Sequence, residues 1–130
     1  MIFNYRIIIT TMSKLFLPIF LFGSLGCSQS TDIESSDAIS LLKNNEYYFL
    51  DVTTLKEHKE KSIPGTHCIP LQVIEQRIQE IDQYRGKNII VYCRSGNRSG
   101  AATKILNANG FKAYNLVGGM NEWNGPVITN

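Results

Sequence analysis

The chain carries little net charge. Its 130 residues have a formal net charge of +2, and only 18% of them are charged. Two of the 13 basic residues, Arg6 and Lys14, precede Cys27, whereas no acidic residue does. The part from Cys27 onward is therefore neutral, since 11 acidic residues face the remaining 11 basic ones. A neutral domain has no general attraction to nucleic acid or anionic lipid, so we expect it to bind neither.

Three further features are absent. No glycine is followed by Lys-Ser or Lys-Thr, which excludes a Walker phosphate loop. The two histidines, His58 and His67, have no partner at metal-ligand spacing, so we predict packing or surface roles and no metal site. The apolar stretch 15–25 is about half as long as the ~20 residues that a membrane-spanning helix needs. With 130 residues, 43% of them hydrophobic, the chain has room for one globular domain.

The first residues do contain the features of an export signal. Lys14 precedes the apolar core 15–22, and small residues follow the core. This order predicts a signal peptide over residues 1–26. Met12 is an alternative first residue, because Met12-Ser13-Lys14 forms a compact positive start.

Cys27, which follows this leader, resembles the lipidation site of bacterial lipoproteins. Gly26 precedes it and Ser28 follows it. The resemblance implies that Cys27 becomes a lipid-bearing N-terminus that anchors an exported, periplasmic protein to a membrane. An ordinary signal peptide cleaved nearby and a short uncleaved anchor are the alternatives. We expect membrane contact only through the lipid or the leader.

The remainder divides into a polar tether, 27–32, and a domain, 33–130, in which strands alternate with helices. Strands are predicted at 47–50, 89–91 and 111–115. A first helix is predicted after an N-cap offered by Ser35-Ser36-Asp37, and further helices at 54–59, at 71–86, from the loop after Cys93 to Gly110, and at 120–123. Residues 89–91 are apolar in succession, which indicates a strand covered on both faces. The predicted fold class is α/β, with a mainly parallel central sheet flanked by helices on both faces.

Cys93 is the strongest candidate for a reactive group. It directly follows the buried strand, and the loop behind it leads into a helix. Backbone N–H groups and the positive helix end then point at the sulfur, and both favour a thiolate over a thiol. We predict that Cys93 is a nucleophile and that the loop contacts the substrate through Arg94, Ser95, Gly96, Asn97, Arg98 and Ser99.

The loop residues suggest separate roles. Arg98, and less clearly Arg94, would hold anionic oxygens, since a guanidinium suits paired oxygens. Gly96 allows the backbone to turn without a Cβ clash. Ser95 and Ser99 either contact the substrate or cap the helix. Asp51, at the end of another strand, is expected to support the loop or a turn rather than to transfer protons.

Cys68 is the other cysteine of the domain. Its short apolar surroundings, His67-Cys68-Ile69-Pro70, favour a buried free thiol. A disulfide and a resolving thiol are the alternatives, because exported proteins often pair their cysteines.

From residue 33 to the C-terminus the sequence resembles the single-domain rhodaneses, a sulfurtransferase family. The segments that carry the resemblance are Phe49-Leu50-Asp51-Val52, Ile63-Pro64-Gly65-Thr66, Val91-Tyr92-Cys93-Arg94-Ser95-Gly96-Asn97-Arg98-Ser99 and Leu116-Val117-Gly118-Gly119-Met120 with Trp123. The resemblance implies a rhodanese-like fold and no cofactor. It also implies sulfane-sulfur transfer from thiosulfate or a persulfide to cyanide or a thiol, through a persulfide on Cys93. Thr53, Ser62 and Cys68 depart from the family's usual arginine, histidine and asparagine.

Two alternative functions remain open. A persulfide carrier or sensor that docks on a partner protein would need the same activated thiol. A phosphatase or arsenate reductase of this fold has one residue more between its cysteine and arginine than the four that separate Cys93 and Arg98. The shorter loop of this chain encloses a smaller space, which favours binding of a sulfur atom over binding of a larger oxyanion.

Overall fold

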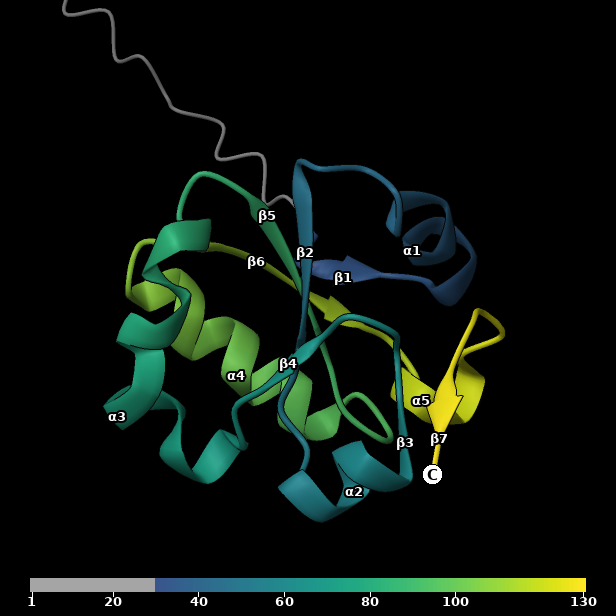
Figure 1. The fold of residues 1–130 in the computed structure, drawn as a ribbon. Helices are drawn as coiled ribbons and strands as arrows, with labels where there is room; N and C mark the ends of the chain where they lie inside the picture. Colours follow the sequence, from purple (N-terminus) through teal and green to yellow (C-terminus); the bar gives the residue numbers. More distant parts are fainter. Residues whose placement is uncertain (1–29) are drawn as a thin grey trace, which may run out of the picture.

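A computed structural model describes residues 30–130 of the chain (Figure 1). The predicted signal peptide and the predicted lipidation site, Cys27, lie outside these residues. Within the described part, no helix is both long and apolar enough to cross a membrane.

A parallel sheet of five strands forms the centre of the domain, in the order β1-β6-β5-β2-β4. The strands are β1 (Asp32–Ile33), β2 (Tyr47–Asp51), β4 (His67–Cys68), β5 (Asn88–Tyr92) and β6 (Lys112–Leu116). A separate antiparallel pair joins β3 (Lys61–Ser62) to β7 (Ile128–Thr129), which places the C-terminus beside the start of β3 (Figure 1). The predicted mainly parallel sheet is confirmed.

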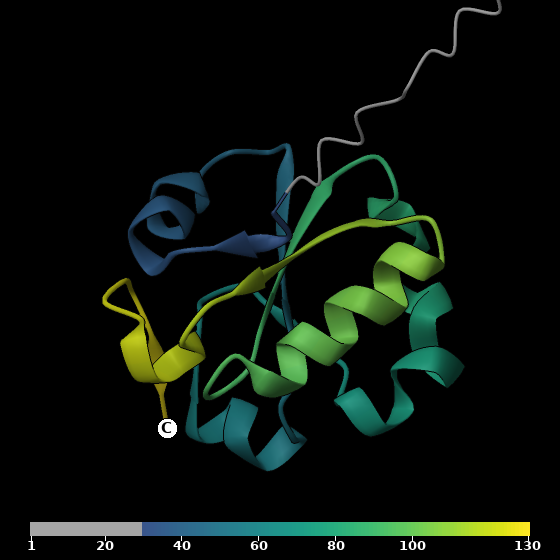
Figure 2. The same ribbon diagram turned by 180° about the vertical axis from the view of Figure 1, so that it is seen from behind.

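Helices cover both faces of this sheet. They are α1 (Ser35–Leu41), α2 (Leu55–Glu60), α3 (Ile74–Arg77), α4 (Asn97–Ala108) and α5 (Gly119–Glu122), with 3-10 turns η1 (Leu71–Val73) and η2 (Ile78–Tyr84). Apolar residues of α3, η2 and α4 pack on one face, and those of α1 and α5 on the other. Figure 2 shows α4 running alongside β5 and β6.

Strand β5 supplies both halves of the core. Ile89 and Val91 belong to the cluster under α4, whereas Ile90 and Tyr92 belong to the cluster under α1 and α5. All four side chains have no exposed surface. The successive apolar residues of this strand thus indicated correctly that it is covered on both faces.

Two local predictions were wrong. The helix expected over 71–86 is divided into η1, α3 and η2, because Ile78, Ile81 and Tyr84 are three residues apart and a three-residue turn aligns them as well as an α-helix does. Helix α1 begins at Ser35, so the capping position falls on Glu34, whose side chain makes no capping bond.

The carboxyl ends of the parallel strands meet at one edge of the sheet. Strand β5 ends at Tyr92 and β2 ends at Asp51, and these two residues are paired in register. Cys93 therefore emerges beside the segment that follows Asp51. Crevices at this edge are the usual binding sites of open parallel sheets.

Candidate active site

Cys93 lies beneath a tight loop between β5 and α4. The residue has no exposed surface. Gly96, which precedes the first residue of α4, has φ of +94°, and this conformation turns its N–H toward the sulfur. The Gly96 N–H donates to Cys93 Sγ over 3.1 Å. A Cβ atom at position 96 would lie 3.1 Å from the Gly118 nitrogen. Both the positive φ and this close approach therefore favour glycine here.

The loop favours the charged form of the thiol. Burial raises the pKa of Cys93, but hydrogen bonds from the Ser99 side chain and from the backbone N–H groups of Ser99, Gly96 and Ser95 outweigh it and hold the pKa below its usual range. The predicted convergence of loop N–H groups on the sulfur is thus present. A thiolate is the nucleophilic form of cysteine.

The Ser99 hydroxyl has two competing acceptors. It lies 3.4 Å from Cys93 Sγ and 2.6 Å from Asn115 Oδ1 on β6. Because a hydroxyl carries only one proton, it can donate to one acceptor at a time, and the shorter contact favours Asn115. Asn115 therefore controls how much Ser99 can stabilise the thiolate, a role that nothing in the sequence indicated.

Substitutions of Ser99 and Asn115 should move the pKa of Cys93 in opposite directions. Ser99→Ala removes a donor and should raise the pKa. Asn115→Ala releases the hydroxyl to the sulfur and should lower it. The measurement is the midpoint of the pH dependence of Cys93 alkylation, and movement of both variants in the same direction would contradict the competition.

Backbone hydrogen bonds from the C-terminal segment fix the start of the reactive loop. The Met120 N–H donates to the Cys93 carbonyl oxygen, and the Asn121 N–H donates to the Arg94 carbonyl oxygen, both over 2.9 Å. Gly118 and Gly119 precede these donors and both have positive φ. The Gly-Gly turn therefore positions the first residues of the reactive loop.

Arg98 forms an ion pair that the sequence did not predict. Its Nη1 and Nη2 atoms donate to the two carboxylate oxygens of Glu57 over 2.8 and 2.9 Å. The hydrogen bonds from Arg98, and then that from the Thr54 N–H, lower the pKa of Glu57 to about 2. The carboxylate therefore stays ionised and ties the start of α4 to α2.

The Arg94 guanidinium group is more exposed and less tightly paired than that of Arg98. Its side chain is 63% exposed, and its nearest carboxylate oxygen, on Glu57, is 3.6 Å away. It lines a cavity of about 230 Å³ beside the loop, together with Thr53, Glu57, Glu60, Lys61, Met120 and Asn121. Thr53 is thus part of this cavity, at a position where the sequence departs from the usual arginine.

The remaining predicted site residues do not contact the sulfur through their side chains. Ser95 and Asn97 are exposed, and Ser95 acts through its backbone N–H. Asp51 is buried, and its Oδ1 accepts the Thr53 N–H while its Oδ2 accepts His58 Nδ1, each over 2.8 Å. Asp51 thus holds the turn that leads into α2.

Cys68 is a free and buried thiol, and Cys93 is free as well. Burial, followed by the negative charge of Asp51, raises the pKa of Cys68 to about 12. The two cysteines therefore have opposite electrostatic surroundings, and only that of Cys93 favours a thiolate.

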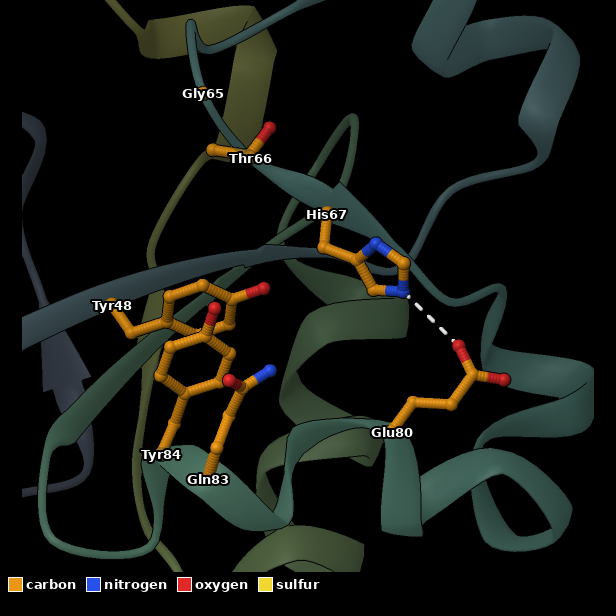
Figure 3. Close-up of a pocket in the computed structure, with 7 residues that line it drawn as sticks. All are labelled: Tyr48, Gly65, Thr66, His67, Glu80, Gln83 and Tyr84. Carbon is orange, nitrogen blue, oxygen red and sulfur yellow. Dashed lines mark hydrogen bonds and ion pairs between the residues drawn. The ribbon is translucent and has the colours of Figure 1, made fainter.

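A second hollow lies around the start of β4, apart from the residues of the reactive loop. It has a volume of about 320 Å³ and is lined by Tyr48, Gly65, Thr66, His67, Glu80, Gln83 and Tyr84 (Figure 3). The rings of Tyr48 and Tyr84 stack at 3.6 Å, and His67 Nε2 lies 3.1 Å from Glu80 Oε2. Figure 3 shows His67 directed at Glu80 and the two tyrosine rings face to face. His67 is exposed, which corresponds to the surface role among the two that the sequence left open.

A parallel α/β sheet with a cysteine loop between β5 and α4 defines the class of this domain, and comparison with known proteins identifies its family. The chain belongs to the rhodanese family, because the family profile described as "Rhodanese-like domain" matches residues 34–126. The predicted family membership is confirmed.

Individual relatives share about a third of the aligned residues. The Bacillus subtilis "Putative sulfur carrier protein YrkF" is 38% identical over 79 residues, which cover 60% of this chain and 42% of that protein. The "Putative sulfurtransferase YtwF" of the same organism is 35% identical over 84 residues, which cover 65% and 80%. A rhodanese-related protein from Thermoplasma volcanium superposes with a TM-score of 0.69 at 28% identity, over 76% of this chain and 98% of that one.

Proposed function

We propose that this chain is a sulfurtransferase that moves a sulfane sulfur from thiosulfate, or from a persulfide, to cyanide or a thiol. The Cys93 thiolate attacks the outer sulfur of thiosulfate. The S–S bond of the donor breaks, sulfite leaves with the electron pair, and a persulfide forms on Cys93. Cyanide then attacks the outer sulfur of the persulfide, and thiocyanate leaves as the thiolate is regenerated.

One observation carries this proposal: hydrogen-bond donors converge on a single buried sulfur. The Gly96 N–H donates to Cys93 Sγ over 3.1 Å, and the backbone N–H groups of Ser95 and Ser99 also hydrogen-bond to it. The same donors would stabilise the anionic outer sulfur of the persulfide. The alternative phosphatase function is disfavoured because Glu57 already binds both Nη atoms of Arg98, the group that would have to hold a phosphate.

The two arginines should respond differently to substitution. Arg94→Gln should raise the KM for thiosulfate at least roughly tenfold, because one charge-assisted hydrogen bond contributes about 1.5–3 kcal/mol. Arg98→Gln should instead destabilise the fold by about 1 kcal/mol, or roughly 4–8 °C in Tm, since it breaks the contact with Glu57. Steady-state kinetics and thermal unfolding measure the two effects. If Arg98→Gln raised the KM and Arg94→Gln did not, Arg98 would be the residue that binds the sulfur donor.

The direct test is thiocyanate formation from thiosulfate and cyanide, followed by the intact mass of the protein after treatment with thiosulfate alone. Turnover together with one added sulfur atom supports the proposal. One added sulfur without turnover favours the alternative, a persulfide carrier or sensor, and that outcome would agree with the name of the relative YrkF. Hydrolysis of phosphate esters without thiocyanate formation would overturn both.

We also propose that the protein is exported and anchored to a periplasmic membrane face through lipid on Cys27. The support is the positive residue Lys14, the short apolar core and the cysteine that follows it. Mass spectrometry of the mature N-terminus tests this, and an unmodified terminus beyond Cys27 would contradict lipidation.

A further inference from the structure

Three potential metal ligands come together at the carboxyl ends of β2 and β4. Asp51, His58 and Cys68 each offer one ligating atom, and these atoms lie within 4.8 Å of one another. Asp51 and Cys68 are buried, whereas the His58 side chain is 24% exposed. The three residues are separated in sequence, so no ligand spacing in the chain indicated this cluster.

The fold explains why these side chains converge. Asp51 on β2 and Cys68 on β4 are partners in register, and partners on adjacent parallel strands point to the same face of the sheet. Helix α2 begins directly after the turn that Asp51 holds, and this brings His58 Nδ1 within 2.8 Å of Asp51 Oδ2. Two strands and one helix thus contribute one ligand each.

We propose that Asp51, His58 and Cys68 form a binding site for a divalent cation of the zinc type. Sulfur, imidazole nitrogen and carboxylate oxygen are the three ligand types that Zn²⁺ takes in proteins, whereas Mg²⁺ and Ca²⁺ take oxygen ligands. In a tetrahedral zinc site these ligand atoms lie roughly 3.5 Å apart. Closing the widest pair from at most 4.8 Å therefore needs a shift of about 1 Å.

The surroundings of the site orient two of its ligands. The Thr53 N–H donates to Asp51 Oδ1 over 2.8 Å, which leaves Oδ2 directed at the cluster. The Cys68 thiol donates to the Thr53 carbonyl oxygen over 3.5 Å, which holds the sulfur beside the same turn. The contact to Asp51 fixes the direction of the ligand oxygen and strengthens metal binding, whereas the contact to Cys68 positions the thiol before the metal binds. His58 is the one partly exposed residue of the three, and a water molecule on its side of the cluster would complete a set of four ligands.

Binding has a simple proton balance. Cys68 loses its thiol proton to solvent when the sulfur binds the cation, and the S–H bond to the Thr53 carbonyl is lost at the same time. His58 also gives up the Nδ1 proton that it donates to Asp51 Oδ2, so that the neutral imidazole carries its proton on Nε2, at solvent, and both Nδ1 and Oδ2 are free to turn to the cation. No oxidant or reductant takes part. The site uses none of the groups that contact Cys93 Sγ, so it goes beyond the proposed sulfur transfer and does not depend on it.

The experiment is a titration of the reduced, metal-free full chain with Co²⁺ and then with Zn²⁺ in competition with a chromophoric chelator. Co²⁺ bound to a thiolate gives a charge-transfer absorption band that reports the sulfur ligand directly. The parent should show this band at one equivalent, and Zn²⁺ should displace it. Cys68→Ser should abolish the band, and His58→Gln should weaken the affinity at least roughly tenfold.

The chain supplies matched controls for both ligand types. Cys27→Ser and Cys93→Ser remove the other two thiols, and His67→Gln removes the other histidine, so all three should bind Co²⁺ as the parent does. If Cys68→Ser does not fold, His58→Gln still tests the site, because this side chain lies on the partly exposed face of α2. Absence of the band in the parent, its loss in Cys93→Ser, or unchanged affinity in His58→Gln would overturn the proposal.

Discussion

Cys93→Ser should reduce thiocyanate formation from thiosulfate and cyanide to the uncatalysed rate. A serine hydroxyl stays protonated, whereas the hydrogen bonds of the loop lower the pKa of the Cys93 thiol and so favour its nucleophilic form. The variant also has no sulfur on which a persulfide can form. Steady-state thiocyanate production, measured at equal concentrations of parent and variant, gives the expected loss.

The intact mass separates this loss from a folding defect. After thiosulfate treatment the parent should carry one added sulfur atom, and Cys93→Ser should carry none while unfolding at a similar temperature. Cys27→Ser is the matched thiol control and should keep the full rate, because Cys27 precedes the domain. A Cys93→Ser protein that keeps the rate would show that another residue carries the sulfur.

Gly119→Ala should be the most disruptive single-methyl substitution near the site. Gly119 has φ of +51°, which costs a residue with a Cβ roughly 1–2 kcal/mol. Its added methyl would also collide with the Cys93 carbonyl oxygen and lie 2.8 Å from the Arg94 carbonyl oxygen. Backbone atoms cannot move aside cheaply, so overpacking adds roughly 1–3 kcal/mol. We expect the free energy of unfolding to fall by about 2–5 kcal/mol in total.

The same substitution should impair the chemistry, because the displaced carbonyl groups belong to the reactive loop. The Met120 N–H that holds the Cys93 carbonyl follows directly after Gly119. Denaturant unfolding and thiocyanate kinetics measure the two effects. Gly86→Ala is the control: its Cβ would meet nothing within 4 Å, and its φ is not positive. Equal behaviour of the two variants would refute this account of the turn.

The sequence predicted the site best where the interacting residues are close together along the chain. Cys93, Gly96 and Ser99 lie within seven consecutive residues, and a cysteine between a strand and a helix was enough to predict that N–H groups converge on the sulfur. The two-residue strands β1, β3, β4 and β7 were missed, since so few residues leave no periodic pattern.

The long-range partners were beyond sequence reasoning. Glu57 meets Arg98 across 41 positions, and Asn115 meets Ser99 across 16. Arg98 was expected to face the donor, because two arginines beside a thiol suggest an anion site. Only the folded arrangement shows that a carboxylate already binds it. The cluster of Asp51, His58 and Cys68 was missed for the same reason.

Glu57 gives the domain a shared anchor for two helices. Its Oε2 accepts the Thr54 N–H at the start of α2 and an N–H of Arg98 near the start of α4. Because the pKa of Glu57 falls from 4.5 unfolded to about 2 folded, its stabilising effect is complete above about pH 4.5 and disappears as the pH falls through about 2. Mild acid therefore leaves the anchor charged, whereas strong acid would loosen both helices together and free the sulfur-bearing loop.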